Sequence, residues 1–216
     1  MAPNGALVTI TVQREAPSAL PEYASVAIAF ETDRVMRVAS HHTDSNRYVL
    51  SEEPLPTAIS KDYDTLDAPA SWPNRFDLSR WMFFGAYAGD QRVGGAVGIM
   101  RSPDVWLLDA RDDVALLWDI RVALTARRVG VGSALLQAVE TWAAEQGARW
   151  LKVETQDINV AACRFYDRHG FCLRMVNPRA YPNLPGETQL LWYKEIGEAP
   201  SAHDHPPGGH PGRTRP

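Results

Sequence analysis

A glycine-containing segment, Arg127-Arg128-Val129-Gly130-Val131-Gly132-Ser133, carries the clearest chemistry in this sequence. It lies between a predicted strand over residues 114–122 and a predicted helix over residues 131–146. The N-terminus of a helix leaves backbone N–H groups without intrahelical partners and carries a partial positive charge. Glycines let the backbone approach a ligand closely, and the two arginines add fixed charge. This combination predicts a site for a pyrophosphate.

Three kinds of phosphate loop compete for this segment. A Walker A loop is excluded, because no Gly-Lys-Ser/Thr follows at the required spacing. A dinucleotide-binding turn needs a glycine where Leu135 stands, and it begins directly at a strand end, whereas Gly130 comes several residues later. Glu154, at the end of the next predicted strand, is the one feature in its favour. The third pattern, Arg-x-x-Gly-x-Gly, is formed by Arg127, Gly130 and Gly132.

The residues downstream continue this third pattern. Glu154 ends a predicted strand, Asn159 begins a short predicted helix, and Phe165-Tyr166 and Gly170-Phe171 follow. In this order they resemble the GNAT superfamily of acetyl-CoA-dependent N-acyltransferases. The resemblance covers roughly residues 80–195. It implies an α/β fold with a single mixed, mostly antiparallel sheet, which is splayed at the cofactor strands and flanked by helices.

Within this superfamily, the C-terminal half resembles the streptothricin acetyltransferases. The run ETQDxNxxACxFY over residues 154–166 carries most of the likeness, together with Tyr181 and the ending LWY at residues 191–193. Upstream, Lys61-Asp62-Tyr63 and Asp119-Ile120-x-Val122 fit the same group, whereas the first 60 residues show no clear match. Two positions depart from the group, because Trp118 stands where an acid is usual and Arg121 where a small residue is usual.

The resemblance implies a set of residues that hold acetyl-CoA, which is a cosubstrate here. The backbone of the strand would pair with the pantetheine arm and polarise the thioester carbonyl, the loop would bind the pyrophosphate, and Asn159 would bond the pantetheine amide. These cofactor-binding residues are Ile120, Arg121, Val122, Arg127, Arg128, Val129, Gly130, Val131, Gly132, Ser133, Asn159 and Tyr166. No metal is expected.

Acetyl transfer to an amine also needs an acid and a base. The resemblance implies that Tyr166 protonates the leaving thiolate, and a phenol with a pKa near 10 is a reasonable donor for that step. From the helix alone, Tyr166 could equally be a core aromatic beside Phe165. The ammonium must lose a proton before attack, and Asp119 and Glu154 are both candidate bases, directly or through a water.

Four residues are expected to line the acceptor pocket: Trp118, Asp119, Asp157 and Tyr181. Strict strand alternation would put Trp118 and Ile120 on one face of the sheet and Asp119 and Arg121 on the other. Asp119 could then pair in the neighbourhood of Arg121, or with Arg128, instead of acting on the acceptor.

The elements that must position these residues follow from the apolar pattern. Strands are predicted over residues 6–12, 81–88, 93–101, 114–122, 150–154, 171–176 and 189–194, and helices over 131–146 and 159–169. The paired Gly94 and Gly95 indicate a bulge or close packing. Residues 17–50 are predicted as helical, and residues 51–77, with four prolines among many acids, as loop. One domain over residues 1–196 is expected, followed by a disordered Pro/Gly/His-rich tail over residues 197–216.

Composition excludes several other classes of protein. The net charge is −4 and the sequence pI is about 5.9, so binding of nucleic acid through bulk charge is not expected. No apolar run reaches the roughly 20 residues of a membrane span. Cys163 and Cys172 fit no metal or redox motif, and the N-terminus has no signal-peptide pattern. The sequence therefore predicts a cytoplasmic protein with buried thiols.

The function that these observations favour is an acetyl-CoA-dependent N-acetyltransferase. Its acceptor would be a primary amine of a small molecule, with streptothricin, and hence antibiotic inactivation, as one candidate. The departures at Trp118 and Arg121 keep other amines open, namely a different antibiotic, a polyamine or a protein lysine. A non-catalytic acyl-CoA-binding module would keep the loop but lack Tyr166. A monomer and a homodimer both remain open.

Overall fold

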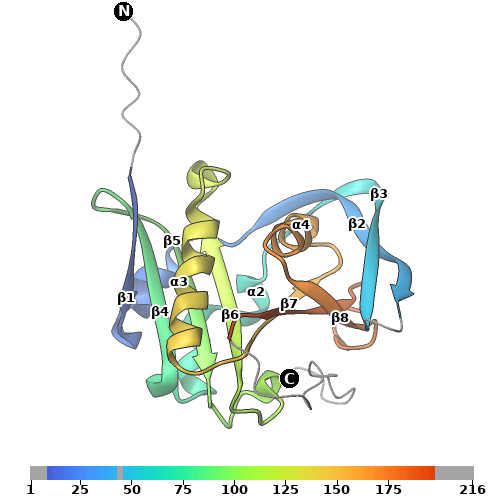
Figure 1. The fold of residues 1–216 in the computed structure, drawn as a ribbon. Coiled ribbons are helices and arrows are strands. Elements are labelled where there is room, and N and C mark those ends of the chain that lie inside the picture. Colours follow the sequence, from blue (N-terminus) through green and yellow to red (C-terminus); the bar gives the residue numbers. More distant parts are fainter. Residues whose placement is uncertain (1–8, 43–45, 198–216) are drawn as a thin grey trace, which may run out of the picture.

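The computed structural model describes residues 9–42 and 46–197 and builds them around two β-sheets. The larger sheet has seven strands in the order β1-β4-β5-β6-β7-β9-β8, and β2 and β3 form a separate two-stranded sheet (Figure 1). The strands are β1 (Ile10–Glu15), β2 (Phe30–His42), β3 (Arg47–Lys61), β4 (Trp81–Ala88), β5 (Gln91–Met100), β6 (Val114–Val122), β7 (Trp150–Gln156), β8 (Cys172–Asn177) and β9 (Gln189–Glu195). Among these pairs, only β6 and β7 are parallel. The expected mixed, mostly antiparallel sheet is confirmed.

Helices cover the larger sheet on both faces. They are α1 (Leu20–Ala24), α2 (Asp64–Asp67), α3 (Val131–Glu145) and α4 (Val160–Arg168), with 3-10 segments η1 (Pro17–Ala19), η3 (Pro69–Asn74), η4 (Leu78–Arg80), η5 (Trp106–Leu108) and η6 (Leu124–Ala126). α3 packs on β4, β5 and β6 and buries Leu135, Val139 and Trp142 there. Tyr23 of α1 and Trp72 of η3 belong to a second buried cluster, on the other face. None of the helices in the described part is long and apolar enough to span a membrane.

The unit that runs from α3 to α4 forms where the sequence predicts it. α3 ends at a left-handed glycine, Gly147, whose φ is +81°. Asn159 caps α4, because its side-chain oxygen accepts a hydrogen bond from the N–H of Ala162 at 3.2 Å. Gly170, also with a φ of +81°, follows the end of α4. Local stop and start signals therefore fix both helices.

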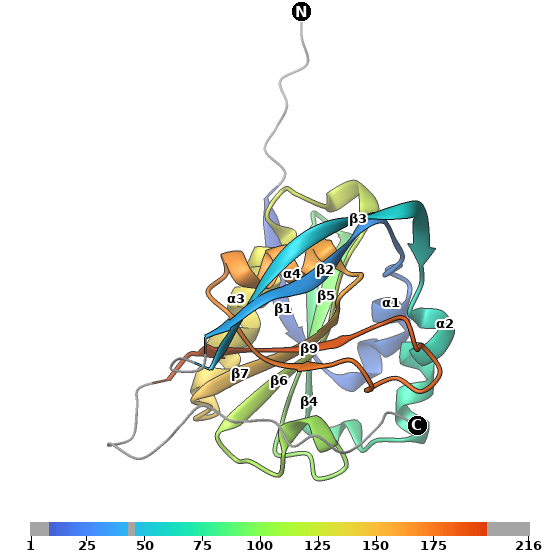
Figure 2. The same cartoon turned by 90° about the vertical axis from the view of Figure 1, so that its right-hand side faces the viewer.

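The prediction for residues 17–61 is largely wrong. Instead of helix and loop, β2 and β3 form a long antiparallel hairpin that reaches over α4 and β8 (Figures 1 and 2). Most of its side chains are exposed, so no continuous apolar stripe marks it in the sequence. Both edges of a two-stranded ribbon are outer edges, so β3 tolerates Pro54 and Pro56. Residues 62–80 do form loops and short helical turns, in part as expected.

β6 and β7 separate after a short parallel register. That register runs from Val114 and Trp150 to Leu117 and Val153. Beyond it, β6 continues to Val122 along β5, and β7 continues along β9. The two inner backbone edges then face each other without ladder hydrogen bonds, and the strands visibly diverge in Figure 1. This opening is the splay that the sequence predicts.

Close packing explains the paired glycines in β5. A Cβ on Gly94 would lie 2.8 Å from the carbonyl oxygen of Arg121, and one on Gly95 would lie 2.7 Å from the ring of Tyr23. Cys163 is buried, and burial raises the pKa of its thiol to about 12. Cys172 is partly buried. The predicted tail lies almost wholly outside the described residues, which end at 197.

Candidate active site

The glycine loop presents backbone donors at the start of α3. Gly130, with a left-handed φ of +95°, precedes the helix and provides no side-chain cap. Across the described chain, the N–H groups of Val131, Gly132 and Ser133 have no hydrogen-bond partner, and the first turn holds no acidic residue. A Cβ placed on Gly130 would meet nothing within 4 Å. The loop therefore fits a pyrophosphate, because its open donors and the helix dipole stabilise an anion.

The two arginines of the loop differ in what they touch. Arg127 donates from Nε to the carbonyl of Val122 at 3.1 Å and from Nη2 to the carbonyl of Ala29 at 3.0 Å. Burial lowers the pKa of its guanidinium. Arg128 is exposed and has a left-handed φ of +64°. Arg127 thus ties the loop to β6 and to the segment before β2, while the charge of Arg128 faces solvent beside the loop.

A histidine joins α4 to the first turn of α3. Nδ1 of His169 lies 2.8 Å from the carbonyl oxygen of Phe165, which can only accept, so Nδ1 carries a proton. In the neutral ring, Nε2 is then the acceptor, and the hydroxyl of Ser133 donates to it at 3.0 Å. The sequence analysis included Ser133 but missed His169, since no local pattern links two residues so far apart in the chain.

A β-bulge in β6 changes which side chains share a face of the sheet. Asp119 pairs with Val97 while Leu117 pairs with Gly98, so Trp118 is the extra residue on β6. The bulge lies at the residue where β6 leaves β7.

The predicted strict alternation along β6 is therefore wrong at this point. The ring of Trp118 packs edge-on against Trp72, and the Asp119 carboxylate accepts a hydrogen bond from Tyr23, whose ring contacts Trp72 as well. Trp118 and Asp119 thus lie on the same face, because the bulge adds one residue between Leu117 and Asp119. Ile120 turns to the opposite face and packs against the cluster beneath α3.

Asp119 is held in a buried ion-pair network. Its Oδ2 accepts hydrogen bonds from Nε and Nη2 of Arg121, at 2.9 and 2.6 Å, and from the hydroxyl of Tyr23 at 2.7 Å. Arg121 also donates to both oxygens of Asp64, at 3.1 Å each, and to the carbonyl of Val26 at 3.0 Å. Its side chain is 1% exposed. Asp119 therefore pairs with Arg121, which is one of the two arrangements that the sequence left open. The side chain of Arg121 is used to connect β6 to α2.

Glu154 has a different environment. Its two oxygens accept hydrogen bonds from the hydroxyl of Tyr181 at 2.8 Å and from Nε2 of Gln189 at 2.7 Å. The Tyr181 hydroxyl in turn accepts from Gln156 at 3.0 Å. No lysine or arginine in the described ranges forms a salt bridge with Glu154. Its carboxylate is thus oriented by two neutral donors, and the charge of Lys152 acts on it without forming a salt bridge.

Tyr166 lies in the core beneath α4. Its ring contacts Phe165 and Phe171 edge-on, at centroid distances of 5.2 and 5.3 Å. Burial, with a smaller contribution from the charge of Asp119, raises the pKa of its phenol well above the ordinary tyrosine value. No group among the described residues hydrogen-bonds to its hydroxyl. Tyr166 is thus a core aromatic whose O–H makes no hydrogen bond to another described residue.

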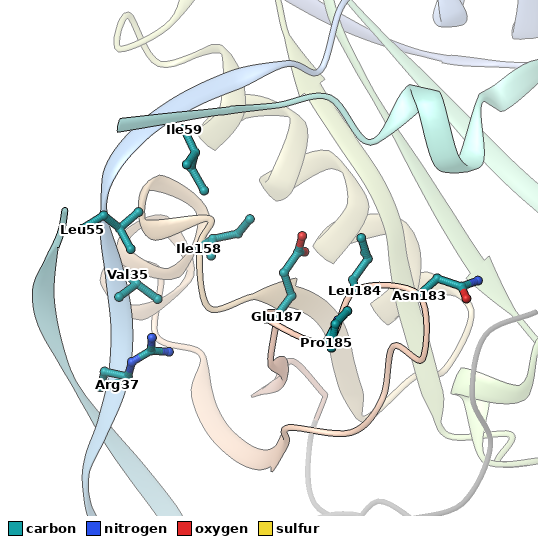
Figure 3. Close-up of a pocket in the computed structure, with 10 residues that line it drawn as sticks. Val35, Arg37, Leu55, Ile59, Ile158, Asn183, Leu184, Pro185 and Glu187 are labelled. Atoms are coloured by element: carbon teal, nitrogen blue, oxygen red, sulfur yellow. The ribbon is translucent and has the colours of Figure 1, made fainter. Parts of the chain in front are cut away.

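Asp157 is buried beside Arg37, which is one of the residues that line a cavity of about 370 Å³ between the hairpin and the β8–β9 connection. Its carboxylate accepts from Nη1 of Arg37 at 2.8 Å and from the N–H of Thr188 at 2.9 Å, and burial raises its pKa. Arg37 and Glu187 line the cavity, and Figure 3 shows the Glu187 carboxylate directed between Ile158 and Leu184.

Sequence reasoning missed Glu187 and Gln189. Glu187 is 8% exposed, forms an ion pair with Lys61 and accepts a hydrogen bond from Tyr63 at 2.7 Å. Lys61 and Tyr63 belong to a pattern that the sequence analysis did single out, but their partner lies more than a hundred residues away. Gln189 begins β9, and nothing in its local sequence distinguishes it.

Comparison with known proteins identifies the family. A model of the acetyltransferase (GNAT) family matches residues 40–171, which is more than half of the chain. The chain belongs to the GNAT acetyltransferase family. Among curated proteins, streptothricin acetyltransferase A of Bacillus subtilis (strain 168) is 44% identical over 81 residues, which cover 37% of this chain and 47% of the relative. Streptothricin acetyltransferase of Escherichia coli is 29% identical over 113 residues, which cover 51% and 60% of the two chains. This GNAT chain thus spans about half the length of the curated relatives it matches.

Solved structures of GNAT proteins agree over a longer stretch. A nourseothricin acetyltransferase superposes with a TM-score of 0.66 at 26% identity, covering 87% of this chain and 98% of that one. A structure described as a streptothricin acetyltransferase of Bacillus anthracis str. Ames, in complex with acetyl coenzyme A, gives 0.69 at 22% identity, with 87% and 99% covered. The second likeness supports the fold alone. The resemblance predicted from the sequence is confirmed.

Proposed function

We propose that this chain is an acetyl-CoA-dependent N-acetyltransferase whose acceptor is a primary amine of a small molecule. One observation carries the proposal. The sheet opens between β6 and β7, with a pyrophosphate-compatible loop at one end of the opening and a carboxylate held by neutral donors, Glu154, at the other. Membership of the GNAT family supports the same activity.

Acetyl-CoA, when bound, supplies an acetyl thioester. The N–H groups of residues 131–133 would hold its pyrophosphate, and the exposed charge of Arg128 would add to that field. The open edge of β6 from Trp118 to Val122 offers backbone groups to the pantetheine arm. Asn159 uses its side-chain oxygen as a helix cap, and its side-chain amide remains a donor for a pantetheine carbonyl.

Electrostatics favours Glu154 over Asp119 as the base. Asp119 already accepts three hydrogen bonds, two of them from Arg121, so its negative charge is balanced inside the protein. A carboxylate held in this way by a buried guanidinium is poorly placed to reach an acceptor amine. Glu154 accepts only from Tyr181 and Gln189 and can take the proton of an ammonium, directly or through a water.

Tyr166 would then protonate the thiolate that leaves. Its raised pKa keeps the phenol protonated at neutral pH, and its hydroxyl is not committed to another described residue. The raised pKa also makes the phenol a weaker acid, so the role rests on the uncommitted hydroxyl and on the GNAT resemblance rather than on the pKa. This role separates an enzyme from a module that only binds acyl-CoA, since a binding module needs the loop but not Tyr166.

Streptothricin is the first acceptor to test, because relatives and structural neighbours carry that substrate in their names. The measurement is release of free thiol from acetyl-CoA at pH 8, with streptothricin, kanamycin, spermidine and a lysine peptide as acceptors. We expect turnover with streptothricin. A protein that ends at Ile196 serves as a control for the tail and should behave like the full chain.

Two results would contradict parts of the proposal. Turnover with another amine but not with streptothricin would replace the acceptor and keep the chemistry. Binding of acetyl-CoA by calorimetry without turnover of any amine would instead favour a binding module, and absence of both would contradict the assignment of the loop.

A further inference from the structure

Trp118 and Glu154 flank the point where the sheet opens. Leu117 and Val153 form the last pair of the parallel register, and Trp118 and Glu154 are the next residues of the two strands. Both point to the face opposite α3. Leu191, which pairs with Glu154 across β7 and β9, belongs to the buried cluster on which the Trp118 ring packs. An aromatic ring and a carboxylate held by neutral donors thus lie on the same face, one on each strand, where the sheet opens.

The ring of Trp118 is fixed by other aromatic rings. Its centroid lies 5.3 Å from those of Phe76 and Trp81 and 6.2 Å from that of Trp72, with interplanar angles of 72°, 51° and 87°. Trp72 and Trp81 are buried, whereas Trp118 keeps part of its surface exposed. A ring that is held by three neighbouring rings and keeps part of its surface exposed is a pre-organised contact surface, which loses little entropy when a ligand binds.

The same strand anchors the segment that holds this ring. Arg121 of β6 bonds Asp64 at the start of α2, and Asp67 at its end accepts from Nε1 of Trp72 at 3.1 Å. Arg75 also forms an ion pair with Asp67, and its guanidinium lies over the ring of Phe76. Arg121 is therefore a positioning residue, because it fixes the segment that carries the rings of Trp72 and Phe76 relative to the bulge in β6.

The charge beside Trp118 is negative rather than positive. Arg121 is the nearest guanidinium on β6, but Asp119 and Asp64 both bond to it and leave no net positive charge. Glu154 adds a further negative charge, and Lys152, whose charge acts on it, already bonds Asp109. An ammonium is therefore attracted to this mouth, and the ring beside it can make cation–π and stacking contacts.

From this geometry we infer that Trp118 determines acceptor specificity, and that the acceptor is a primary amine carried on a ring or a bulky carbon skeleton. The ammonium meets Glu154 while the adjacent ring or skeleton lies on the exposed surface of Trp118. Short open-chain amines reach the carboxylate but leave the indole uncovered. This inference rests on the proposed function, since it concerns the acceptor of that reaction.

The test compares phenethylamine with ethylamine as acceptors, at saturating acetyl-CoA, for the wild-type protein, Trp118→Ala and Trp118→Phe. The wild type should prefer phenethylamine in kcat/KM. Trp118→Ala should lower that preference about 5- to 30-fold, which is the range of a partly desolvated aromatic contact. Trp118→Phe should restore most of the preference, and the KM for acetyl-CoA should stay unchanged in both variants.

Trp106→Ala is the matched control, because Trp106 is another partly buried indole. It lies in η5, which precedes the start of β6, whereas the opening lies beyond Leu117. This variant should leave the preference unchanged even if it lowers the melting temperature. A preference that survives Trp118→Ala, or a wild type that acetylates streptothricin but prefers neither amine, would overturn the inference and leave the proposed function standing. A wild type that acetylates no amine at all would overturn both.

Discussion

Replacing Glu154 by glutamine should lower kcat by about 10²- to 10⁴-fold, the usual contribution of a positioned general base. Glutamine keeps the size of the side chain, and its amide oxygen can still accept from Tyr181 at the 2.8 Å position. In the wild type, Nε2 of Gln189 donates to the second carboxylate oxygen of Glu154 at 2.7 Å. In the variant, the new NH₂ group would face Nε2 of Gln189, so two donors would meet and this hydrogen bond would be lost. One lost hydrogen bond of this kind costs about 1–3 kcal/mol. At about 2–4 °C per kcal/mol for a chain of this size, the melting temperature should fall by no more than about 12 °C.

The assay must separate proton removal from structural damage. The acceptor pair is ethylamine and trifluoroethylamine, because the fluorinated amine is already neutral at pH 8 and needs no base before attack. Glu154→Gln should therefore be strongly impaired with ethylamine and much less so with trifluoroethylamine. A misfolded or misaligned site would lose activity toward both amines alike.

Asp119→Asn is the matched comparison. It removes one of two carboxylates from a guanidinium that is 1% exposed, and breaking such a buried pair costs about 3–5 kcal/mol. The melting temperature should fall by about 6–20 °C, while kcat of the folded protein changes by less than about tenfold and equally for both amines. If Asp119→Asn instead loses ethylamine turnover selectively while Glu154→Gln retains it, the electrostatic reasoning that separates the two carboxylates is refuted.

Three further predictions follow from the cofactor side of the site. Tyr166→Phe should lower kcat about 10²- to 10⁴-fold with an unchanged Kd for CoA. Because burial raises the Tyr166 pKa, the kcat of the wild-type protein should not decline between pH 8 and about pH 9.5, as it would if the phenol ionised in that range. Arg128→Gln should weaken CoA binding several-fold at low salt without changing the melting temperature, whereas Arg127→Gln should lower that temperature, since it breaks the bonds to the carbonyls of Val122 and Ala29. His169→Phe should alter the calorimetric Kd for CoA but not the KM for acetyl-pantetheine, which has no pyrophosphate, and an equal effect on both would show that the contact with Ser133 is only structural.

The fold between residues 114 and 170 could be predicted because its signals are local. The apolar stripe of α3, the left-handed Gly147 and the Asn159 cap each act within a few residues. The hairpin of β2 and β3 could not, because its stability comes from pairing between strands and from contacts with α4 and β8. Its own exposed sequence contains no apolar period that would reveal those partners.

The site was predicted in part for the same reason. The loop residues are contiguous in the sequence, and Tyr166 belongs to a second contiguous run in α4, whereas the side-chain partners around the site are distant. Arg121 meets Asp64, which is 57 residues away, and Glu154 meets Gln189, which is 35 residues away. Sequence could therefore propose two carboxylates as bases but could not choose between them. That choice depends on which of them the fold has already given a counter-ion.

The extra residue in β6 places apolar and charged side chains on opposite faces of the sheet at the opening. Without the bulge, Asp119 and Arg121 would continue the alternation of Leu117 and face α3, where the buried cluster is apolar. With it, Ile120 and Val122 pack toward that cluster, while Asp119 and Arg121 meet Tyr23 on the opposite face. Burying an ion pair among apolar side chains without further partners is costly, so the bulge is what allows this sequence to keep both charges in the strand. In the proposed function, the face that packs against α3 gives a pantetheine arm an apolar lining, and the face with Tyr23 and Asp119 gives an amine its charged neighbours.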